Sequence, residues 1–552
     1  MDGGEVMKFK KRVSFLTAVA LIGSSLLTGC SSSGGGSATP EEVLANQNAR
    51  VAIAAAVDKQ ALCDVILNTG ATVSNYFTPK NLALDNGKDY TEATKDFGFK
   101  YDEDAAKEAW DKAKKEVGFD NVTLELLTYD HDSGKRCAEF LQGELQDALE
   151  GLTVEVKSLP FKQKLVEETA GNFDLSYAGW GADFPDPLTY LQTMEPGNQF
   201  AKQVGYNNDK FNKLVSEAKA SKAATEAYKK YSEAEKIMLD DCYLAPLYQK
   251  GRTYLEKPYV SGITNFTWGA DYSYINADVN KPEKVLNLAI ESDIPTLDIS
   301  KCTDVVSFTV MDNTMEGLTR VDDKGKVLPG VAESWNVSED GLTWTFKLRK
   351  DSKWSNGEPV TAKDFEYSWK RTLDPTTASE YGYIMSDIVG SSTKEIEAKG
   401  VDGVAVKAVD DNTLEVKLNR PVSYFPELMS FQVFFPQNQK FVEQQDKKYG
   451  TSKDAQLYNG PFTLTDWKME DKYVMTKNPN YWNADKIKLN TINTKIVKET
   501  GAQVNLYEDG QIDRVLLDSD YVDKYKDSKE IHDYIMASTF LLQLNGGKAK
   551  TK

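Results

Sequence analysis

Histidine and closely spaced cysteines are scarce in this chain, and their scarcity argues against several kinds of site. The 552 residues contain two histidines, His131 and His532. So few histidines argue against a histidine-rich metal site and against a Ser-His-Asp hydrolase. None of the five cysteines stands at CxxC spacing from another, which argues against a structural zinc site. His131 and Cys137 are six residues apart, and we interpret both as surface loop residues rather than a catalytic pair.

Basic clusters are also missing from the body of the chain. The 84 acidic residues outnumber the 66 basic ones, the formal net charge is −18, and the basic residues are scattered. A nucleic-acid-binding protein needs a basic stripe or patch, so the composition argues against that class. The one basic cluster is the segment MKFKKR at residues 7–12, and it belongs to a different pattern.

An apolar run long enough to span a membrane is absent too. The basic segment is followed by a shorter apolar stretch at residues 13–27 and by LTGC at residues 27–30. This layout is typical of a secretory signal, and its end resembles a bacterial lipobox, in which the cysteine receives a lipid. We predict a lipoprotein signal peptide over residues 1–29, lipidation of Cys30 and a flexible tether over residues 30–38. The disulfide state of the other cysteines stays open, and these are Cys63, Cys137, Cys242 and Cys302.

What is present is the composition of a globular protein with more than one core. With 552 residues, 40% of them hydrophobic, the chain is long enough for two or three lobes. Strand patterns alternate with helix patterns in the first half, which predicts a mixed α/β lobe. A helix over residues 102–117 ends at Gly118, and the second half begins afresh with a strand after residue 284. Other expected elements are strands at 121–129, 152–159 and 173–181, and helices at 46–69, 134–150, 208–239 and after the N-cap Thr361.

Three stretches carry a resemblance to a known family. They are PGVAESWNVSEDGLTWTFKLRKDSKWSNGEPVTAKDFEYSWKRTLDPTTASEYGY (329–383), YNGPFTLTDWKMEDKYVMTKNPNYWN (458–483) and GNFDLSYAGWGADFPDPLTYL (171–191). All three are similar to segments of the peptide-binding receptors of bacterial ABC importers, which include oligopeptide- and dipeptide-binding proteins. The resemblance covers nearly all of residues 40–547. It implies a two-lobed periplasmic-binding-protein fold of type II, of the large cluster C type with an extra domain, whose mixed sheets are flanked by helices.

The order of these stretches differs from that family. The equivalent of KVLNLAIESDIPTLD (284–298) begins the mature family protein, whereas here it follows the equivalent of the family's ending and a joining segment, DVNKPE (278–283). The chain looks like a circular permutant cut in a loop of the C-terminal lobe, by engineering, natural rearrangement or misassembly of the gene. The expected lobes are lobe III at 39–265 completed by a strand at 538–547, lobe I at 266–308 and 434–537, and lobe II, an insertion, at 309–433.

The segment GWGADFPDPLTYL places a carboxylate, Asp183, between Trp180 and Phe184. Ionised side chains rarely enter apolar surroundings unless a partner needs the charge. The resemblance implies the partner, because the family's equivalent aspartate pairs with the α-ammonium group of the bound peptide. The alternative is a helix-capping or turn aspartate, a role for which Asp186 is better placed.

Other binding residues follow from the resemblance. The strand edge from Tyr177 to Gly181, with Ala182 after it, is expected to pair with the peptide backbone. Asp293 and Ile294 are expected to supply the opposite edge. Aromatic side chains that line side-chain pockets in the family, or belong to the core, are Trp180, Phe161 and Tyr381.

The chain differs from the family at the positions that bind the C-terminal carboxylate of the peptide. Enteric oligopeptide receptors have an arginine at the position of Tyr177 and a histidine near Gly134. The carboxylate contacts therefore do not carry over, and the preferred peptide length stays open. Lys135 and Arg136 are candidates to substitute, with solvated loop charges as the alternative.

Residues and resemblance together predict a lipid-anchored extracytoplasmic receptor that binds extended peptides between two lobes and delivers them to the permease of an ABC transporter. Such a receptor is expected to perform no chemistry, to need no cofactor or metal, and to act as a monomer on the outer face of the cell membrane. Alternatives are a receptor of the same fold for an oligosaccharide, nickel or haem, a secreted glycosidase and a protein that binds nothing. No pair of carboxylates stands out for the glycosidase.

Overall fold

In the computed structural model, the described residues are 38–85, 87–221 and 223–547. The predicted signal peptide, Cys30 and the tether as far as residue 37 lie outside them. Several sheets alternate with helices along the chain, so the expected mixed α/β class is confirmed. Within the described ranges, no helix combines the length and the apolar character that crossing a bilayer requires.

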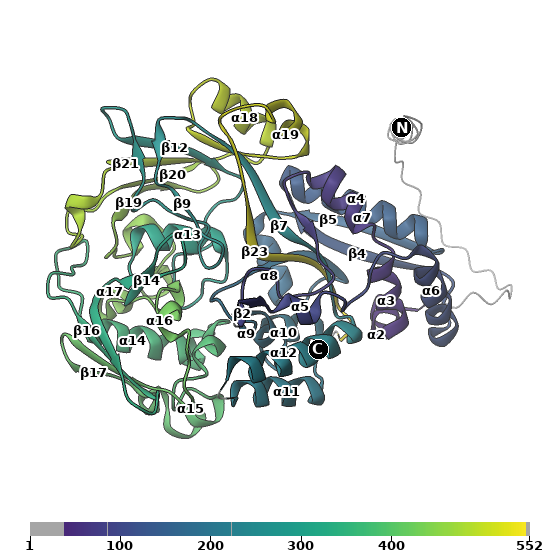
Figure 1. The fold of residues 1–552 in the computed structure, drawn as a ribbon, viewed down its shortest axis with the longest axis horizontal. Helices are drawn as coiled ribbons and strands as arrows, with labels where there is room; N and C mark the ends of the chain where they lie inside the picture. Colours follow the sequence, from purple (N-terminus) through teal and green to yellow (C-terminus); the bar gives the residue numbers. More distant parts are fainter. Residues whose placement is uncertain (1–37, 86, 222, 548–552) are drawn as a thin grey trace, which may run out of the picture. The chain divides into compact units, whose positions relative to one another are not determined.

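The largest sheet has seven strands in the order β1-β7-β23-β6-β4-β5, with β22 also paired to β7. β4 runs parallel to β5 and β6, whereas β23 is antiparallel to both β6 and β7. In Figure 1, β23, coloured yellow, runs beside the blue strand β7 in this sheet. The strands are β1 (Thr72–Val73), β4 (Val122–Tyr129), β5 (Leu152–Leu159), β6 (Leu175–Gly181), β7 (Leu244–Glu256), β22 (Arg514–Leu517) and β23 (Ile531–Leu544).

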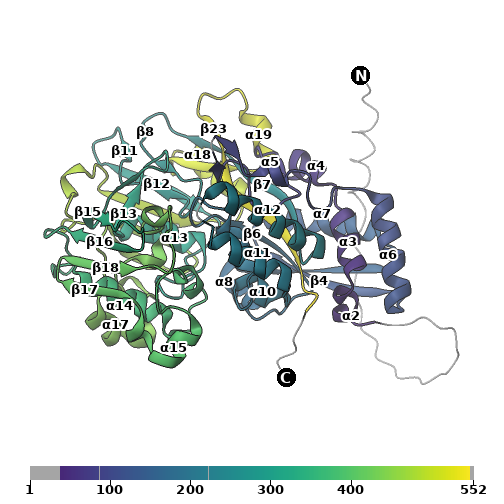
Figure 2. The same ribbon diagram turned by 60° about the horizontal axis from the view of Figure 1, so that its bottom comes forward.

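Helices of the first half surround this sheet, and α6 shows how local sequence sets their ends. The side chain of Asp102 caps its first turn, a stripe of alanines around Trp110 is buried, and Gly118 ends the helix with a φ of +84°. α6 packs along α3, and α11 packs along α12 (Figure 2). The helices of this half are α2 (Pro40–Ala45), α3 (Gln47–Ala55), α4 (Lys59–Ala61), α5 (Thr91–Thr94), α6 (Glu103–Val117), α7 (Asp132–Ala148), α8 (Phe161–Thr169), α9 (Leu188–Leu191), α10 (Gln199–Val204), α11 (Asp209–Lys219) and α12 (Ala224–Asp241).

Two four-stranded sheets lie in the second half. The first has the order β12-β21-β20-β19, and its strands are β12 (Val285–Ile290), β19 (Phe462–Lys468), β20 (Lys472–Lys477) and β21 (Thr491–Ile496). The second has the order β15-β16-β18-β17, and its strands are β15 (Ala332–Val337), β16 (Thr343–Leu348), β17 (Val406–Asp410) and β18 (Thr413–Lys417). Two-stranded ladders complete the strands of the described chain: β2 (Leu84–Asp85) with β3 (Lys88–Asp89), β8 (Val260–Ser261) with β11 (Asp278–Val279), β9 (Thr264–Asn265) with β10 (Tyr272–Ser273), and β13 (Thr319–Val321) with β14 (Val327–Pro329).

The helices of the second half include α14, whose start confirms a prediction from the sequence. Thr361 is its N-cap, and Thr361 and Asp364 form a capping box in which each side chain accepts from the other's backbone N–H. These helices are α13 (Val305–Thr314), α14 (Ala362–Leu373), α15 (Thr393–Lys399), α16 (Phe425–Leu428), α17 (Gln439–Gln445), α18 (Thr500–Glu508) and α19 (Ser519–Tyr525).

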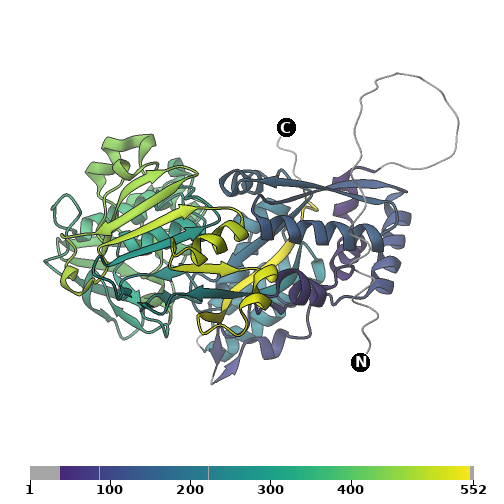
Figure 3. The ribbon, with the colours of Figure 1, turned by 90° about the horizontal axis from the view of Figure 1, so that it is seen from above.

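The two long strands β7 and β23 pair along most of their length. The first half of β23, residues 531–535, pairs with residues 251–255 of β7. After an irregularity in the register, residues 538–544 continue between β7 and β6. Figure 3 shows the yellow β23 passing from the yellow helices α18 and α19 into the blue sheet. The expected strand at 538–547 therefore begins earlier, at Ile531, and the expected lobe boundary after residue 537 falls inside one continuous strand.

Most other expected elements are present with shifted ends. The strands expected at 121–129, 152–159 and 173–181 are β4, β5 and β6, each within two residues of its expected bounds. The helix expected at 134–150 is α7, which starts earlier because His131 caps its first turn. The pattern at 208–239 forms two helices, α11 and α12, and the pattern at 46–69 ends as α3 at Ala55 before shorter turns.

Candidate functional site

Asp183 lies directly after β6 and is buried, with 4% of its surface exposed. Its backbone N–H donates to Thr189 Oγ1 at 2.9 Å, and the Thr189 hydroxyl lies 3.4 Å from Asp183 Oδ2 as a donor. The Tyr381 hydroxyl donates to Asp183 Oδ1 at 3.1 Å. Within the described chain, no lysine, arginine or histidine forms an ion pair with this carboxylate. Burial raises the pKa of Asp183 well above its usual range, and the two hydroxyl donors offset only part of that effect.

Aromatic rings surround this carboxylate, and two of them were expected there. Trp180 stacks on Tyr381 with ring centroids 6.0 Å apart, and Tyr381 stacks in turn on Tyr383 at 5.6 Å. The indole N–H of Trp180 donates to the backbone oxygen of Thr189 at 3.1 Å. The structure thus brings Asp183, Trp180 and Tyr381 together from segments almost two hundred residues apart, with Gly181 and Ala182 between Trp180 and the carboxylate.

The edge of β6 that faces away from β23 is largely open. On that side, β4 pairs only with Leu175 and Ser176, so no described strand pairs with residues 177–181. The side chain of Tyr177 is buried, and its hydroxyl is hydrogen-bonded to that of Tyr248. Tyr177 can therefore contact a ligand through its backbone, but it has no positive side chain for a peptide carboxylate. The arginine that the family has at this position has no counterpart here.

Phe161, Asp293 and Ile294 meet elsewhere, around a cavity of about 40 Å³. That volume holds only a few water molecules, so the cavity is closed to a larger ligand in this conformation. The Asp293 carboxylate accepts from Trp467 Nε1 at 3.1 Å and from the backbone N–H of Glu470 at 2.7 Å. The Asp293 side chain is thereby held in place by its neighbours at the cavity wall.

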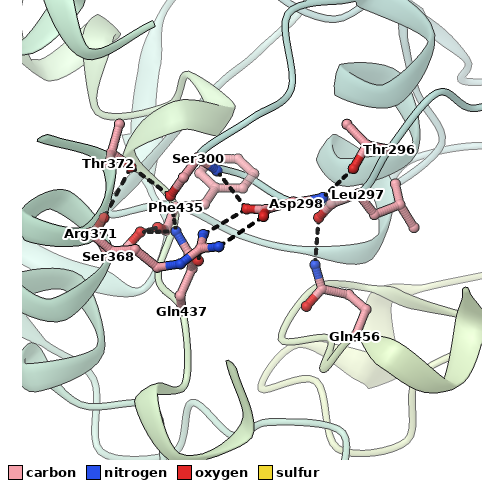
Figure 4. Close-up of polar contacts among 10 residues, drawn as sticks. All are labelled: Thr296, Leu297, Asp298, Ser300, Ser368, Arg371, Thr372, Phe435, Gln437 and Gln456. Atoms are coloured by element: carbon pink, nitrogen blue, oxygen red, sulfur yellow. Dashed lines mark hydrogen bonds and ion pairs between the residues drawn. The ribbon is translucent and has the colours of Figure 1, made fainter. Parts of the chain in front are cut away.

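The loop that carries Asp293 is fastened to α14 by a polar network (Figure 4). Arg371 binds Asp298 through two parallel bonds, of 2.6 and 2.8 Å. Gln437 accepts from Arg371 at 2.9 Å and donates to Ser300 and Ser368, both at 2.9 Å. These bonds give the loop a defined position beside the cavity.

Polar contacts connect the residues after β4 with those after β12 and β21. Lys498 Nζ lies 2.7 Å from Asp130 Oδ2, and His131 Nδ1 lies 3.5 Å from Glu291 Oε2. Burial lowers the pKa of His131. Since His131 caps α7 and is mostly buried, our interpretation of it as a surface loop residue was wrong.

The structure also tests the sequence interpretations of Cys137, of Lys135 and Arg136, and of the remaining cysteines. Cys137 is buried on α7, so it too is no surface residue. Arg136 is neither solvated nor free, because its guanidinium binds Asp518 at 2.6 Å and Asp520 at 2.8 Å. Lys135 is exposed, as a solvated charge would be. The four cysteines that were left open are all free and buried.

Asp186 is a turn aspartate before α9, whose N-cap is Pro187. Its Oδ1 accepts from the backbone N–H of Leu188 at 2.9 Å, and burial raises its pKa to about 7. Thr189 orients Asp183 but was not predicted from the sequence. Its position in the segment PDPLTYL, close after Asp183, could have indicated this role. Among the described residues, no group of three or more histidine, cysteine, aspartate or glutamate side chains is arranged to hold a metal ion.

Comparisons with known proteins find a matching family and several relatives. A model of the family described as bacterial extracellular solute-binding proteins, family 5 Middle, matches residues 28–202 and 326–552. A dipeptide-binding protein of Lactococcus lactis subsp. cremoris is 37% identical over 268 residues, which is 48% of this chain and 49% of that protein. The oligopeptide-binding protein OppA of Bacillus subtilis is 39% identical over 234 residues, which is 42% of this chain and 43% of that protein.

Among solved structures, the substrate-binding domain of an oligopeptide ABC transporter from Bacillus anthracis has 48% identity and a TM-score of 0.45, covering 45% of this chain and 48% of that one. The chain thus spans about half the length of the relatives that it matches.

Proposed function

The chain belongs to the bacterial extracellular solute-binding proteins of family 5, and from this premise we propose that it binds peptides in an extended conformation between two lobes and delivers them to an ABC transporter permease. The names of its relatives, a dipeptide-binding and an oligopeptide-binding protein, support the choice of peptides as the solute. The lobe division expected from the sequence is part of this proposal, and each of the three large sheets lies mainly in one of those lobes.

The observation that carries the proposal is the buried carboxylate of Asp183. It has hydroxyl donors on both oxygens and aromatic rings around it, but no cation in the described chain. A buried charge of this kind is costly unless an opposite charge joins it. The α-ammonium group of a peptide is such a charge, and it comes with hydrogen-bond donors of its own.

The open edge of β6 supports an extended backbone for the ligand. On the side away from β23, residues 177–181 have no strand partner among the described residues, and they end two residues before Asp183. An added strand of roughly four or five residues fits along them, at about 3.3 Å per residue. Because the neighbouring cavity holds only a few waters, ligand entry requires the lobes to separate, and the long strands β7 and β23 are where we place that hinge.

The test compares free peptides with N-acetylated peptides. Protein refolded from denaturant, and so free of bound ligand, is titrated calorimetrically with a mixed peptide pool and with the same pool after acetylation. We expect heat from the free pool and little from the acetylated one, since acetylation removes the ammonium charge. Equal binding of both pools contradicts the role of Asp183, and no binding by a protein that still unfolds cooperatively contradicts the peptide proposal itself.

The lipid anchor is a separate part of the proposal and depends on the LTGC segment alone. We propose that a lipid on Cys30 holds the protein at the outer face of the cell membrane. Replacing Cys30 by serine is expected to move the protein from the membrane fraction of a bacterial host into the soluble extracytoplasmic fraction. Retention of the Cys30→Ser protein in the membrane fraction contradicts the anchor.

A further inference from the structure

Lys250, on β7, has no partner for its charge in the described chain. Its side chain is half-buried, and its Nζ forms no hydrogen bond or ion pair with a described residue. Its Nζ lies over the ring of Phe540, at 5.1 Å from the ring centroid. A cation held over an aromatic face is only modestly stabilised, so this position leaves most of the charge available to a ligand.

Phe540 connects this lysine to the open edge of β6. Phe540 is paired with Gly179 in the register of β23 and β6, and a Cβ on Gly179 would come within 2.7 Å of the Phe540 ring. The ammonium group of Lys250 therefore lies at the level of Gly179. Asp183 is four positions after Gly179, which is roughly 13 Å along an extended chain.

None of the carboxylates near Lys250 in the described chain forms an ion pair with it. Asp271 is already bound to Arg252 at 2.8 Å. Glu291 lies beside His131, at 3.5 Å from Nδ1, and lines the cavity that also contains Ile294. Burial and the charge of Arg252 lower the pKa of Lys250 to about 8, against the opposing effects of Asp271 and Glu291. The positive charge is thus poorly compensated in the ligand-free protein.

We propose that Lys250 binds a carboxylate of the peptide three or four residues from its N-terminus. The inference rests on the proposed function, because it takes the ammonium group to be at Asp183. Oppositely charged sites roughly 13 Å apart match the ends of an extended peptide of three to four residues, at about 3.3–3.6 Å per residue. The same site accepts an acidic side chain at that position of a longer peptide. Lys250 then binds the carboxylate in place of the arginine and the histidine that enteric receptors have at the positions of Tyr177 and Gly134.

The experiment uses four peptides and measures their dissociation constants calorimetrically with the ligand-stripped full-length protein. Tetra-alanine as the free acid is compared with tetra-alanine amide, which tests the terminal carboxylate. Ala-Ala-Ala-Glu-Ala amide is compared with its glutamine counterpart, which tests an acidic side chain. For at least one pair, we expect the peptide with the carboxylate to bind about tenfold more tightly or better. The pair that shows this preference tells whether Lys250 binds a terminal carboxylate or an acidic side chain.

Variants then assign the preference to one residue. Lys250→Met is expected to bind both members of the pair equally, with the affinity of the uncharged member unchanged from the parent protein. Lys250→Arg is expected to keep the preference. The matched control is Lys407→Met, which replaces an exposed lysine on another strand, β17, and is expected to behave as the parent.

A second readout separates charge recognition from a packing role. A bound carboxylate raises the pKa of Lys250 from its value of about 8 in the free protein. Near pH 8, binding of the acidic peptide should therefore take up protons, and its affinity should fall as the pH rises further. Burial lowers the pKa of Arg252, but Asp271 and nearby tyrosines together raise it by more, so Arg252 stays charged there. Burial lowers the pKa of His131, so His131 stays neutral. The other charged groups that face Lys250 are Asp271 and Glu291.

Two results overturn the inference. One is a parent protein that shows no preference in either pair, and the other is a preference that survives in Lys250→Met. If these occur while N-acetylation still abolishes binding, the proposed function stands and only the role of Lys250 is lost. If no peptide binds, both fall together.

Discussion

Replacing Asp183 by alanine is expected to weaken the binding of free-amine peptides by about 3–5 kcal/mol. That range corresponds to a loss of affinity between about a hundredfold and several thousandfold. The reason is that the bound ammonium group is left without its anion in a site where Asp183 is 4% exposed and water is scarce. Calorimetric titration of the variant and the parent with the same free peptide measures the loss.

Two other variants separate charge from structure. Asp183→Asn keeps an oxygen that can accept from Tyr381 and removes only the charge, so it should lose most of the affinity as well. Asp186→Asn alters a buried carboxylate three residues away that caps the turn through Leu188, and it should bind as the parent does. Undiminished binding by Asp183→Asn contradicts an ammonium site.

The raised pKa of Asp183 also predicts how the stability of the ligand-free Asp183→Asn variant depends on pH. Because burial raises this pKa in the folded protein, the carboxyl binds its proton more tightly when folded than when unfolded, where its pKa is about 3.9. Its contribution to stability is therefore full below that unfolded value and is lost as the pH rises through the folded pKa. Asp183→Asn should lack this slope and, at neutral pH, unfold at a higher temperature than the ligand-free parent.

Deletion of β23 is expected to abolish cooperative folding of the seven-stranded sheet. β23 lies between β6 and β7 and is hydrogen-bonded to both along most of its length, and its Leu541, Leu542 and Leu544 are completely buried. Each buried leucine contributes about 1.5–3 kcal/mol, before the lost ladder bonds are counted. Their sum is of the size of a whole domain's stability, about 5–15 kcal/mol. Circular dichroism during denaturation of a chain ending at residue 530 measures the effect.

The position of β23 also supports our proposal that the chain is circularly permuted. Every other strand of its sheet except β22 comes from residues 72–256. Gly546, just after β23, lies against the helix α2, where an added Cβ would come within 2.5 Å of the Leu44 carbonyl oxygen. The joining segment begins as β11 at residues 278–279 and turns at residues 280–283, and Lys284 Nζ binds Asp278 Oδ1 at 2.8 Å.

A rejoined chain tests the permutation. It starts at residue 284, continues to residue 547, passes through a short Gly/Ser linker to residue 38 and ends at residue 277. We expect it to fold and to bind the same peptides with unchanged affinity, because the linker joins segments that already lie together. A rejoined chain that fails to fold, while the parent folds, contradicts the permutation.

The local elements and the candidate carboxylate could be predicted from short stretches of the amino-acid sequence. The ends of α6 and the start of α14 depend on residues within four positions of one another, such as Asp102 with Ala105 and Thr361 with Asp364. Such interactions are visible in a short window of sequence. Asp183 was recognisable for the same reason, because its apolar neighbours and the following prolines stand beside it in the chain.

Contacts between distant residues could not be predicted from the sequence, because they depend on how the whole chain packs. Tyr381 binds Asp183 across 198 positions, and Lys250 reaches Phe540 on a strand that enters the sheet from the other end of the chain. His131 and Cys137 looked like loop residues because their burial depends on strands and helices that the local pattern does not show. Pairing register and burial are properties of the whole packed chain. The fold was therefore needed to show which groups pair with each charge, and that Lys250 has no charge partner among the described residues.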